Sequence, residues 1–588
     1  MEVYFQLIKD AETLRTACEE LEKHEFLGFD LETTALDPFE GEIRLVQLAT
    51  SNNNAQIVDM KAFSNPLTNP DLEPLRKVLA SKTSVKIAHN AKFDAKWTKH
   101  HLGVELGNVF DTMLASQLIA AGDTDRRHNL AEVVSHFLNQ ELDKTEQVSD
   151  WSGELSQSQI EYAAKDGVVM LPLREKIVEK LKLDELEDVA NIEFECVVPI
   201  ISMELEGIFL DKTLWAEQLA KVKAEQSKIA DELQDMLSAG VAQASLFGRA
   251  ELNLDSQQQV SDALKNIGVP VPNTTRGWEL EPLANDYPVI AKLLEYRSVG
   301  KNLTTFGEKM LEFINPKTNR IHADFRQIGA PTGRFSCSKP NLQQIPHTAE
   351  YRNAFRAESG KKLIIADYSQ IELRILAEFS DDQNFINAFK SGADFHSITA
   401  SQVFGVTPEN VSAEQRSFAK RLNFGVVYGI GASRFAQMTG VTQTEAEHTM
   451  RRYFGTYPQL NEYLRNAGQT VVKEKLTRTA ANRMIRFRFD ESDYKGVASA
   501  KRVGMNFPIQ GTSADILKRA LRILHDNLQG TSGKLVNIVH DEILVEANEN
   551  ETENVSQILE KAMISAAEQF IKKVPVKVDV KISDAWEK

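Results

Sequence analysis

Five residues in the first third of the chain have the types and spacing of a metal-dependent hydrolytic site. Asp30 and Glu32 are two apart on a predicted strand, so their side chains share one face. Asp94 opens a predicted helix after the strand at 85–89, and Tyr162 and Asp166 lie four apart on another helix, again on one face. Converging carboxylates repel one another unless cations lie between them, and oxygen ligands suit Mg²⁺. Two such ions can activate a water against a phosphodiester.

The three pieces, in this order, resemble the DnaQ-like 3′–5′ exonucleases whose last motif is Tyr-x-x-x-Asp. The resemblance implies that Asp30, Glu32, Asp94 and Asp166 are metal ligands and that Tyr162 orients the attacking water. A single Asp-x-Glu is common among surface acids of acidic domains. The interpretation therefore depends on the combination of all three pieces.

A second pair of acids follows predicted strands near the C-terminus. Asp367 ends the buried strand that begins at residue 363, and Asp541 lies between two apolar strands at 535–539 and 543–546. That pattern predicts a β-hairpin with an acid at its tip. Turn chemistry alone would also explain the tip acid. The two acids are suggestive of another two-metal site without deciding it.

A stripe of cations and aromatics on one predicted helix adds a different chemistry. Arg416, Lys420, Phe424 and Tyr428 are spaced by four and share one helix face. The cations can neutralise charge on a polyphosphate, and the aromatics can pack against a sugar and a base. An amphipathic helix with snorkelling cations is the alternative explanation of the stripe.

Together these patterns resemble motifs A, B and C of the family A DNA polymerases over about residues 190–588. Motif A is Asp367-Tyr-Ser-Gln-Ile-Glu-Leu-Arg, and motif B is Arg416-x₃-Lys-x₂-Asn-Phe-Gly-x₂-Tyr-Gly. Further matching stretches are Thr332-Gly-Arg-Phe-Ser, Pro340-Asn-Leu-Gln-Gln-Ile-Pro and Arg502-x₃-Asn-x-Pro-Ile-Gln-Gly-Thr. The exonuclease-like segment precedes them, as in that family.

This second resemblance implies a role for each motif residue. Asp367 and Asp541 are expected to bind two Mg²⁺ ions, with Mn²⁺ as a possible substitute, at the primer 3′-OH and the triphosphate. Lys420 is the expected proton donor to pyrophosphate, and Glu372 the steric gate against a ribose 2′-OH. The residues expected to contact the dNTP are Arg416, Lys420, Phe424, Tyr428, His396, Glu372 and Gln370. Those expected to contact primer–template DNA are Arg334, Asn341, Gln343, Arg502, Asn506, Gln510 and His540, with Glu542 in a supporting role. Phe at position 424 implies discrimination against dideoxynucleotides.

The elements that position these residues predict an α/β and α+β multidomain chain. Strands and helices alternate over residues 1–180, helices dominate 185–315, and the remainder mixes both, with helices at 498–506 and 512–528 among others. The resemblances imply an RNase H-like exonuclease domain followed by a right-hand polymerase domain. The expected segments are 1–185 (exonuclease), 186–315 (thumb with the first part of the polymerase domain), 316–375 (palm, first part), 376–505 (fingers) and 506–588 (palm, second part).

The distribution of charge separates the chain into two unlike parts. The net charge of −16 argues at first sight against nucleic acid, because affinity for phosphates comes mainly from Lys and Arg. Residues 1–200 carry 20 basic and 36 acidic side chains, whereas residues 201–588 carry 48 of each. Local basic excesses of +5 at 317–356 and +7 at 451–502 coincide with the stretches expected to contact DNA.

Composition bounds the partners and the compartment. The 588 residues include only three cysteines, far apart, and no apolar run near the ~18 residues that a membrane span needs. The N-terminus lacks the pattern of a secretory signal. We expect a monomer that binds primer–template DNA, dNTPs and a single-stranded 3′ end, with no membrane partner. The expected location is the cytoplasm of a bacterial or phage-infected cell, or an organelle if the chain is part of a larger precursor.

Two other readings of the polymerase-like motifs remain open. A single-subunit RNA polymerase shares the two aspartates and the Lys…Tyr helix, but Glu372 and the exonuclease-like segment argue against it. A nuclease whose C-terminal part merely grips DNA would not need Asp367, Asp541 and Lys420. Because Asp30 comes so early in the chain, we expect no 5′ nuclease domain and no 5′–3′ exonuclease activity.

Overall fold

The structure is a computed structural model that describes residues 3–51, 53–142, 145–147, 149–238, 252–271 and 274–587. Contacts divide the chain into two compact units. The first unit comprises Met1–Gly207, Ala323–Ser338 and Ile364–Ile582, and the second comprises Ile208–His322, Lys339–Leu363 and Ser583–Lys588. Two groups of acidic residues belong to the first unit. The first acidic group is Asp30, Glu32, Asp94 and Asp166, and the second is Asp367 and Asp541.

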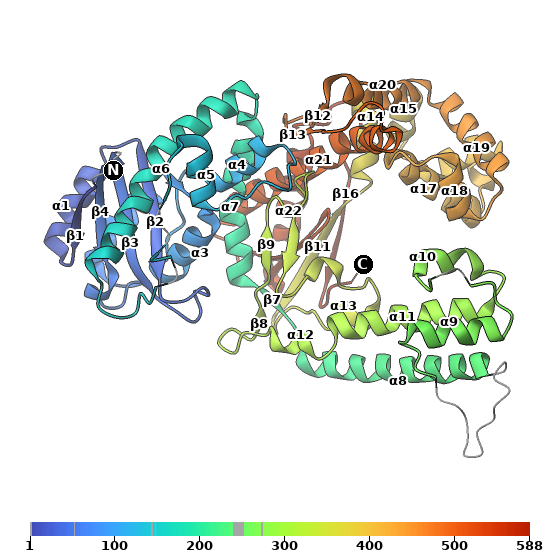
Figure 1. The fold of residues 1–588 in the computed structure, drawn as a ribbon, viewed down its shortest axis with the longest axis horizontal. Helices are drawn as coiled ribbons and strands as arrows, with labels where there is room; N and C mark the ends of the chain where they lie inside the picture. The colour runs from blue at the N-terminus through green and yellow to red at the C-terminus, as the bar shows by residue number, and fades with distance from the viewer. Residues whose placement is uncertain are drawn as a thin grey trace, which may run out of the picture. The chain divides into compact units, whose positions relative to one another are not determined.

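A six-stranded mixed sheet near the N-terminus carries the first acidic group (Figure 1). In spatial order its strands are β1 (Tyr4–Ile8), β4 (Asn54–Asp59), β3 (Ile43–Ser51), β2 (Phe26–Thr33), β5 (Val85–Ala88) and β6 (Val109–Asp111). Its helices are α1 (Ala11–Leu21), α2 (Glu73–Ala80), α3 (Ala91–Leu102), α4 (Thr112–Ala120), α5 (Leu130–Leu138) and α6 (Gln157–Leu183). The predicted α/β character of this part is confirmed.

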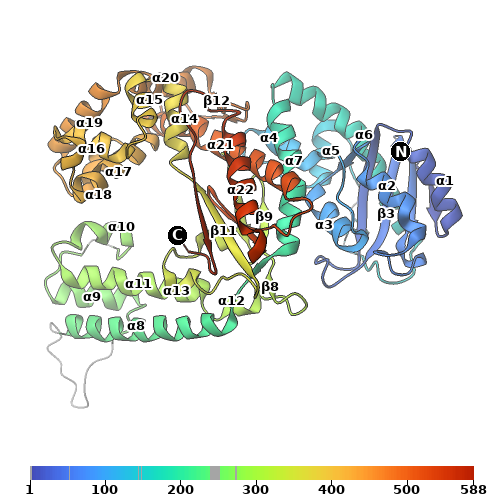
Figure 2. The same cartoon turned by 180° about the vertical axis from the view of Figure 1, so that it is seen from behind.

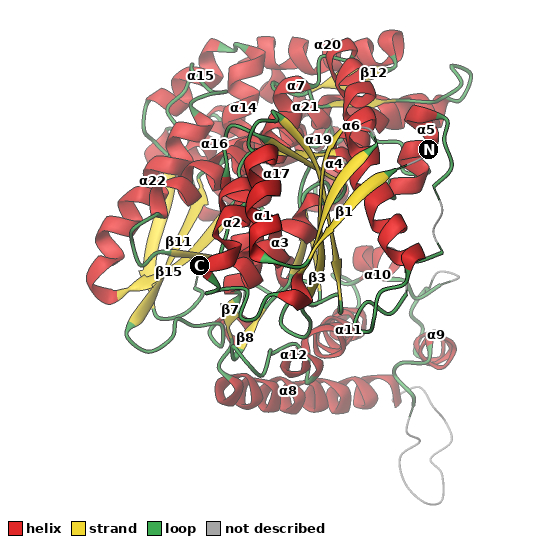
Figure 3. Cartoon of the chain, turned by 90° about the vertical axis from the view of Figure 1, so that its left-hand side faces the viewer, coloured by secondary structure: helices red, strands yellow, loops and turns green. Residues whose placement is uncertain are grey.

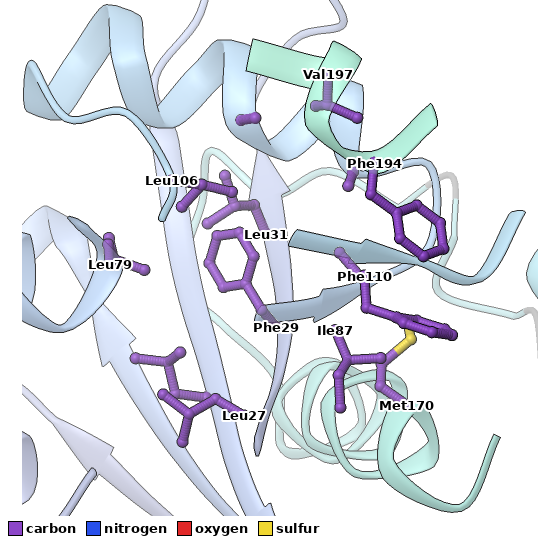
Figure 4. Packing of buried hydrophobic residues seen from close by; sticks show 14 of the residues in the cluster. Leu27, Phe29, Leu31, Leu79, Ile87, Leu106, Phe110, Met170, Phe194 and Val197 are labelled. Carbon is purple, nitrogen blue, oxygen red and sulfur yellow. The ribbon is translucent and has the colours of Figure 1, made fainter. Parts of the chain in front are cut away.

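Helices cover both faces of this sheet because its inner strands are apolar on both sides. On β3, Val46 and Leu48 join a core with residues of α1, α2 and α3, whereas Leu45 and Ala49 pack with residues of α6. Figure 4 shows part of the first core, where Phe29 of β2 lies near Leu31 and Ile87. Figure 3 shows the strands in yellow among the red helices. Because successive side chains of a strand point to opposite faces, Asp30 and Glu32 of β2 lie on the face opposite Phe29.

A four-stranded sheet carries the second acidic group. Its order is β14 (Lys534–Val539), β15 (Glu542–Asn548), β11 (Lys361–Tyr368) and β16 (Val578–Ser583). Figure 2 shows β11 beside the red helix α22 (Thr552–Ala567). The other helices of this region are α7 (Glu187–Glu206), α14 (Ile371–Ser380), α15 (Gln383–Lys390), α16 (Phe395–Phe404), α17 (Ala413–Val427), α18 (Ala432–Thr439), α19 (Gln443–Thr456), α20 (Pro458–Glu474) and α21 (Tyr494–Leu528). Short strands are β9 (Asp324–Arg326), β10 (Ser336–Ser338), β12 (Leu476–Arg478) and β13 (Met484–Arg486).

The prediction of two separate helices at 498–506 and 512–528 is wrong. One helix, α21, runs through both stretches with Pro508 inside it. An interior proline removes one hydrogen bond and costs about 3 kcal/mol. Close packing of the flanking turns offsets that cost: a Cβ on Gly504 would lie 2.2 Å from Val471, and one on Gly511 would lie 2.4 Å from Thr479. Burial on both sides of the proline therefore keeps the helix continuous.

The second unit is mainly helical. Its elements are β7 (Ile208–Phe209), α8 (Lys212–Ser238), α9 (Gln257–Asn266), α10 (Gly277–Leu280), α11 (Pro288–Phe306), α12 (Lys309–Glu312), β8 (Arg320–Ile321) and α13 (Ala349–Arg352). Leu233 and Leu237 of α8 pack with Leu264 of α9 and Leu293 of α11 in one apolar core.

Two chain-wide features concern membranes and cysteines. Within the described ranges, every helix is too short or too polar to cross a bilayer. Cys18, Cys196 and Cys337 are buried and form no disulfide.

Candidate active sites

The first acidic group forms where α6 approaches β2 without intervening side chains. A Cβ on Gly28 of β2 would lie 2.1 Å from the carbonyl oxygen of Gly167 in α6. Asp30 and Glu32 follow Gly28 on the same strand face, and Tyr162 and Asp166 precede Gly167 on the helix. Glycine at position 28 thus allows the helix and the strand to bring their functional side chains together.

Three of the four predicted metal ligands lie close together. One carboxylate oxygen from each of Asp30, Glu32 and Asp166 lies within 4.8 Å of the other two. Asp94, in the first turn of α3, lines the same cavity of about 470 Å³ but is outside this triplet. The Tyr162 hydroxyl also lines the cavity and hydrogen-bonds to Asp166. The four expected metal ligands and Tyr162, expected to orient water, therefore line the same cavity.

Electrostatics at this group favour a bound cation. Burial raises the pKa of Glu32 to about 9, with Asp166 and Asp94 adding repulsion, and burial raises the pKa of Asp166 to about 7. The pKa values of Asp30 and Asp94 are also well above their usual range, mainly because both are buried. Hard divalent ions take oxygen ligands of this kind, so the donor set fits such an ion.

Asp111 supports the turn of α3 that carries Asp94, and neither Asp111 nor the neighbouring His89 was predicted from the sequence. Asp111 is buried and accepts hydrogen bonds from the backbone N–H groups of Asn90 and Ala91, at 3.2 and 2.8 Å, where α3 begins. It also caps α4 through the N–H groups of Met113 and Leu114. Nδ1 of His89 lies 2.9 Å from the hydroxyl oxygen of Thr112. The capping position of Asp111, immediately before α4, is the only sequence signal that could have identified it.

The second acidic group forms at adjacent strands of the four-stranded sheet. β14 and β15 pair antiparallel, with Val539 opposite Glu542, so that Asp541 lies in the tight turn as predicted. His540, in the same turn, is exposed and has a φ of 57°. The N–H of Tyr368 donates to the carbonyl oxygen of Asp541 at 3.5 Å. Asp367, which precedes Tyr368, is therefore beside Asp541, while Glu542 is buried at the start of β15.

The predicted stripe lies on α17 and at its C-terminal end. Arg416, Lys420 and Tyr428 are exposed and Phe424 is half-buried. Asp394 was not predicted: its carboxylate accepts two hydrogen bonds from Arg416, at 2.9 and 2.8 Å, and caps α16. Although burial opposes its charge, hydrogen bonds from Arg416 and Ser397 lower the pKa of Asp394 to about 2. Arg416 thus has a carboxylate partner, and its Nη1 makes no hydrogen bond to the described residues.

His396 lies behind this stripe rather than on the surface. It is buried, its ring centre is 5.8 Å from that of Phe424, and its Nδ1 is 3.0 Å from Nδ2 of Asn423. Burial lowers the pKa of His396 to about 4, so the ring is neutral at pH 7. If Asn423 donates to Nδ1, the remaining proton is on Nε2, and this nitrogen can donate to a phosphate oxygen.

Glu372 is held by two residues from distant parts of the chain. It is buried in the first turn of α14, forms an ion pair with Arg334 and accepts a hydrogen bond from Tyr428. Gln370 starts α14 with a φ of 58°, and Nε of Arg374 donates to the carbonyl oxygen of Ser369 at 2.7 Å. This turn, which the sequence pattern did not resolve, fixes where Glu372 projects.

The residues expected to contact DNA occupy both units. Arg502, Asn506 and Gln510 share one face of α21, where Arg502 is exposed and Nδ2 of Asn506 donates to the carbonyl oxygen of Tyr428 at 3.1 Å. Asn341 and Gln343 belong to the second unit, where the Asn341 side chain accepts from the N–H of Gln343 at 3.2 Å.

Comparisons with known proteins agree with this arrangement. Residues 219–588 match the family described as DNA polymerase family A, and residues 5–182 match one described as 3′-5′ exonuclease. DNA polymerase I of Aquifex aeolicus is 32% identical over 99% of this chain and 100% of its own length. DNA polymerase I of Pseudomonas aeruginosa is 32% identical over 100% of this chain and 66% of its own length. A solved structure, the POL domain of Pol1 from M. smegmatis in complex with DNA primer-template and dNTP, aligns with a TM-score of 0.85 at 26% identity over 99% of both chains.

Proposed function

The chain belongs to DNA polymerase family A and is a DNA polymerase with a 3′–5′ exonuclease domain, and we propose how its residues divide the two activities. Such an enzyme takes part in DNA replication and repair. The alternatives of an RNA polymerase and of a nuclease that merely grips DNA are not favoured. In the proposed division, Asp367 and Asp541 serve extension, and the acidic group around Asp30 serves proofreading.

A single observation carries the polymerase assignment. The hydrogen bond between the N–H of Tyr368 and the carbonyl oxygen of Asp541 joins the backbone next to Asp367 to that of Asp541, so the two acids lie at adjacent strands of one sheet. Enzymes of both families depend on divalent metals. We take the ions to be Mg²⁺, two at Asp367 and Asp541 and two at Asp30, Glu32, Asp94 and Asp166. When bound, such ions lower the pKa of an attacking hydroxyl or water and neutralise charge on the phosphates.

The side chains of α17 and its neighbours are proposed to bind the dNTP. Lys420 is exposed and can hold the triphosphate, and its Nζ donates a proton to the leaving pyrophosphate. Arg416 contributes the N–H groups that Asp394 leaves unused, and His396 a neutral Nε2–H. Phe424 and Tyr428 pack against the sugar and base, and Glu372, beside Gln370, occupies the space that a ribose 2′-OH would need.

Binding of primer–template DNA is supported by the solved relative, which is described as a complex with DNA primer-template and dNTP. We assign duplex contacts to Arg334, Asn341, Gln343, Arg502, Asn506, Gln510 and His540, and a supporting role to Glu542. The proposed segments are 1–185, 186–315, 316–375, 376–505 and 506–588, as exonuclease, thumb, palm, fingers and palm. We further propose that the enzyme is a monomer that acts in the bacterial cytoplasm, where DNA and dNTPs are found.

Primer extension on matched and mismatched 3′ ends, with and without Mg²⁺, tests both sites together. Asp541→Ala should abolish extension and leave degradation of single-stranded 3′ ends. Asp30→Ala should do the opposite, because its carboxylate belongs to the other group. Asp526→Ala and Asp71→Ala, at exposed acids of α21 and of the turn before α2, serve as controls and should retain both activities. Extension at the wild-type rate by Asp541→Ala would refute the polymerase site.

The same assay can follow the 5′ end. The matched regions, 5–182 and 219–588, account for the two activities already assigned. We propose that this 588-residue polypeptide does not degrade DNA from the 5′ end. A 5′-labelled duplex should therefore keep its label through a full extension reaction, and release of labelled mononucleotides would disprove this.

A further inference from the structure

Four fully buried charged side chains form a cluster outside both proposed sites. Glu193 of α7, Arg483 before β13, and Asp515 and Lys518 of α21, here called the buried charge cluster, are each no more than 2% exposed. Nη2 of Arg483 lies 2.5 Å from Oε1 of Glu193 and 2.6 Å from Oδ1 of Asp515, and Lys518 also pairs with Glu193. The two positive and two negative charges balance. Because an unpaired buried charge is strongly unfavourable, each member holds the others in place.

Two neutral side chains also hydrogen-bond to the carboxylates of the cluster. The Thr479 hydroxyl donates to Oδ2 of Asp515 at 2.8 Å, and the Gln327 amide donates to Oε2 of Glu193 at 3.0 Å. Burial opposes every charge in the cluster. Lys518 and Arg483 outweigh it at Glu193 and hold the pKa of Glu193 below its usual range, whereas burial prevails at Asp515, whose pKa is raised, and at Lys518, whose pKa is lowered. The cluster is therefore a fixed, fully paired network. None of its members is among the residues proposed to touch DNA or dNTP.

The buried charge cluster contacts the loop that carries Arg334, at Gly333 before it and at Phe335 after it. Nζ of Lys518 donates to the carbonyl oxygen of Gly333 at 2.7 Å and lies 5.2 Å from the centre of the Phe335 ring. Gly333 has a φ of 80°, and a Cβ there would lie 2.5 Å from Cζ of Arg483. Glycine is needed both for this backbone conformation and for the close approach of the guanidinium.

Arg334 in turn reaches Glu372. The two form an ion pair, and the Tyr428 hydroxyl hydrogen-bonds to both side chains. Displacing the loop backbone would move the base of Arg334 and separate it from Glu372. A continuous chain of contacts therefore connects Lys518 of the buried charge cluster, through Gly333 and Arg334, to the carboxylate of Glu372, which is proposed to face the sugar.

We propose that the buried charge cluster positions Arg334, and through it Glu372, and so sets how strongly the enzyme prefers a dNTP to an rNTP. Its four members are positioning residues, because they act only through the loop. The proposal rests on the proposed role of Glu372 in excluding a 2′-hydroxyl. It assigns sugar selectivity in part to residues that the sequence motifs do not include.

The test removes one charge of each sign, so that the cluster stays neutral. Glu193→Gln with Lys518→Met deletes the contact to Gly333 and leaves Arg483 paired with Asp515. We expect the ratio of kcat/KM for a dNTP to that for the matching rNTP to fall about tenfold, which corresponds to about 1.4 kcal/mol. The control is Arg522→Met with Asp526→Asn, a pair 2.9 Å apart on the same helix with Arg522 half-buried and Asp526 exposed, which should leave the ratio unchanged.

Glu372→Ala separates this proposal from the one on which it rests. If Glu372→Ala keeps full sugar selectivity, the role proposed for Glu372 is wrong. If Glu372→Ala lowers selectivity, the cluster variant should lower it in the wild-type background and add nothing in the Glu372→Ala background. Unchanged selectivity in the first background, or an equal further loss in the second, would overturn the proposal. Should the double variant lack a cooperative unfolding transition, Arg483→Lys, which keeps the charge, is measured in the same way and should shift the ratio in the same direction.

Discussion

Asp111 illustrates how one buried carboxylate can organise a site without entering it. It accepts hydrogen bonds from four backbone N–H groups, two where α3 begins and two in the first turn of α4. Asp94 lies in the first turn of α3, so its position depends on the support that Asp111 gives to that turn. We therefore expect Asp111 to act as a positioning residue for the acidic group proposed to be the exonuclease site.

Asp111→Asn should damage proofreading and stability together. The amide presents an NH₂ group to donors that need an acceptor, and an unsatisfied buried donor costs about 1–3 kcal/mol. We expect a stability loss of that size in denaturant unfolding and slower degradation of single-stranded 3′ ends, with extension retained. Asp10→Asn, at the exposed cap of α1, should change neither, because Asn caps a helix as well as Asp. Wild-type exonuclease rates in Asp111→Asn would show that Asp94 needs no such support.

Phe424→Tyr tests the sugar contact proposed for α17. A tyrosine hydroxyl could replace the hydrogen bond that a dideoxynucleotide cannot make, and one hydrogen bond contributes about 0.5–1.5 kcal/mol, so we expect dideoxynucleotide incorporation to rise up to about tenfold relative to dNTP. Competitive chain-terminator incorporation measures the ratio. Phe418→Tyr, on the same helix but packed between Phe404 and Phe435, should have no such effect. An unchanged ratio in Phe424→Tyr would place the sugar elsewhere.

At the scale of elements, the proposed exonuclease site depends on how closely α6 approaches β2. The strand contributes Asp30 and Glu32, and the helix contributes Tyr162 and Asp166. Neither element holds a complete ligand set. Gly28 sets the separation, because any larger residue there would meet the backbone of α6.

Gly28→Ala should therefore impair the exonuclease selectively. The added Cβ would lie 2.1 Å from a backbone oxygen, so the helix must move, and overpacking of this kind costs about 1–3 kcal/mol. We expect loss of 3′-end degradation with extension intact, measured on the same protein preparation. Gly153→Ala, where a Cβ would meet nothing within 4 Å, is the matched control. Normal degradation by Gly28→Ala would mean that the ligand set tolerates a shifted helix.

At the scale of the whole molecule, the net charge of −16 is the sum of two parts that differ in charge. The excess of acids lies in residues 1–200, which carry the carboxylates proposed for the exonuclease, while residues 201–588 are neutral overall with local basic stretches. Electrostatic attraction to a duplex depends on the charges near it and is screened beyond about 10 Å at 0.1 M salt. An acidic protein can therefore bind DNA through a basic surface.

Binding to primer–template DNA should weaken steeply with salt despite the acidic overall charge. Each neutralised phosphate releases counterions, so the logarithm of affinity falls linearly with the logarithm of salt concentration. Fluorescence anisotropy from about 50 to 300 mM salt measures the slope, and Arg502→Ala should reduce it by about one. Lys23→Ala, at an exposed pair in the acidic part, should leave the slope unchanged. A flat salt response of the wild-type protein would refute a phosphate-based interface.

The order of the amino acids was sufficient to predict those features that depend on short-range patterns. The two-residue period of Asp30 and Glu32, the four-residue period from Arg416 to Tyr428 and the hairpin around Asp541 are each encoded in a few neighbouring positions. Such periods fix which side chains share a face. The motif residues and the family could therefore be identified from the order of the amino acids.

Which distant side chains meet depends on how the elements pack in three dimensions. The pairing of Arg416 with Asp394 and the support of Arg334 by Lys518 join residues 22 and about 185 positions apart. The continuity of α21 through Pro508 likewise depends on burial against Val471 and Thr479 rather than on helix propensity. Such contacts arise from packing between elements, and no local period in the chain records which elements will pack together.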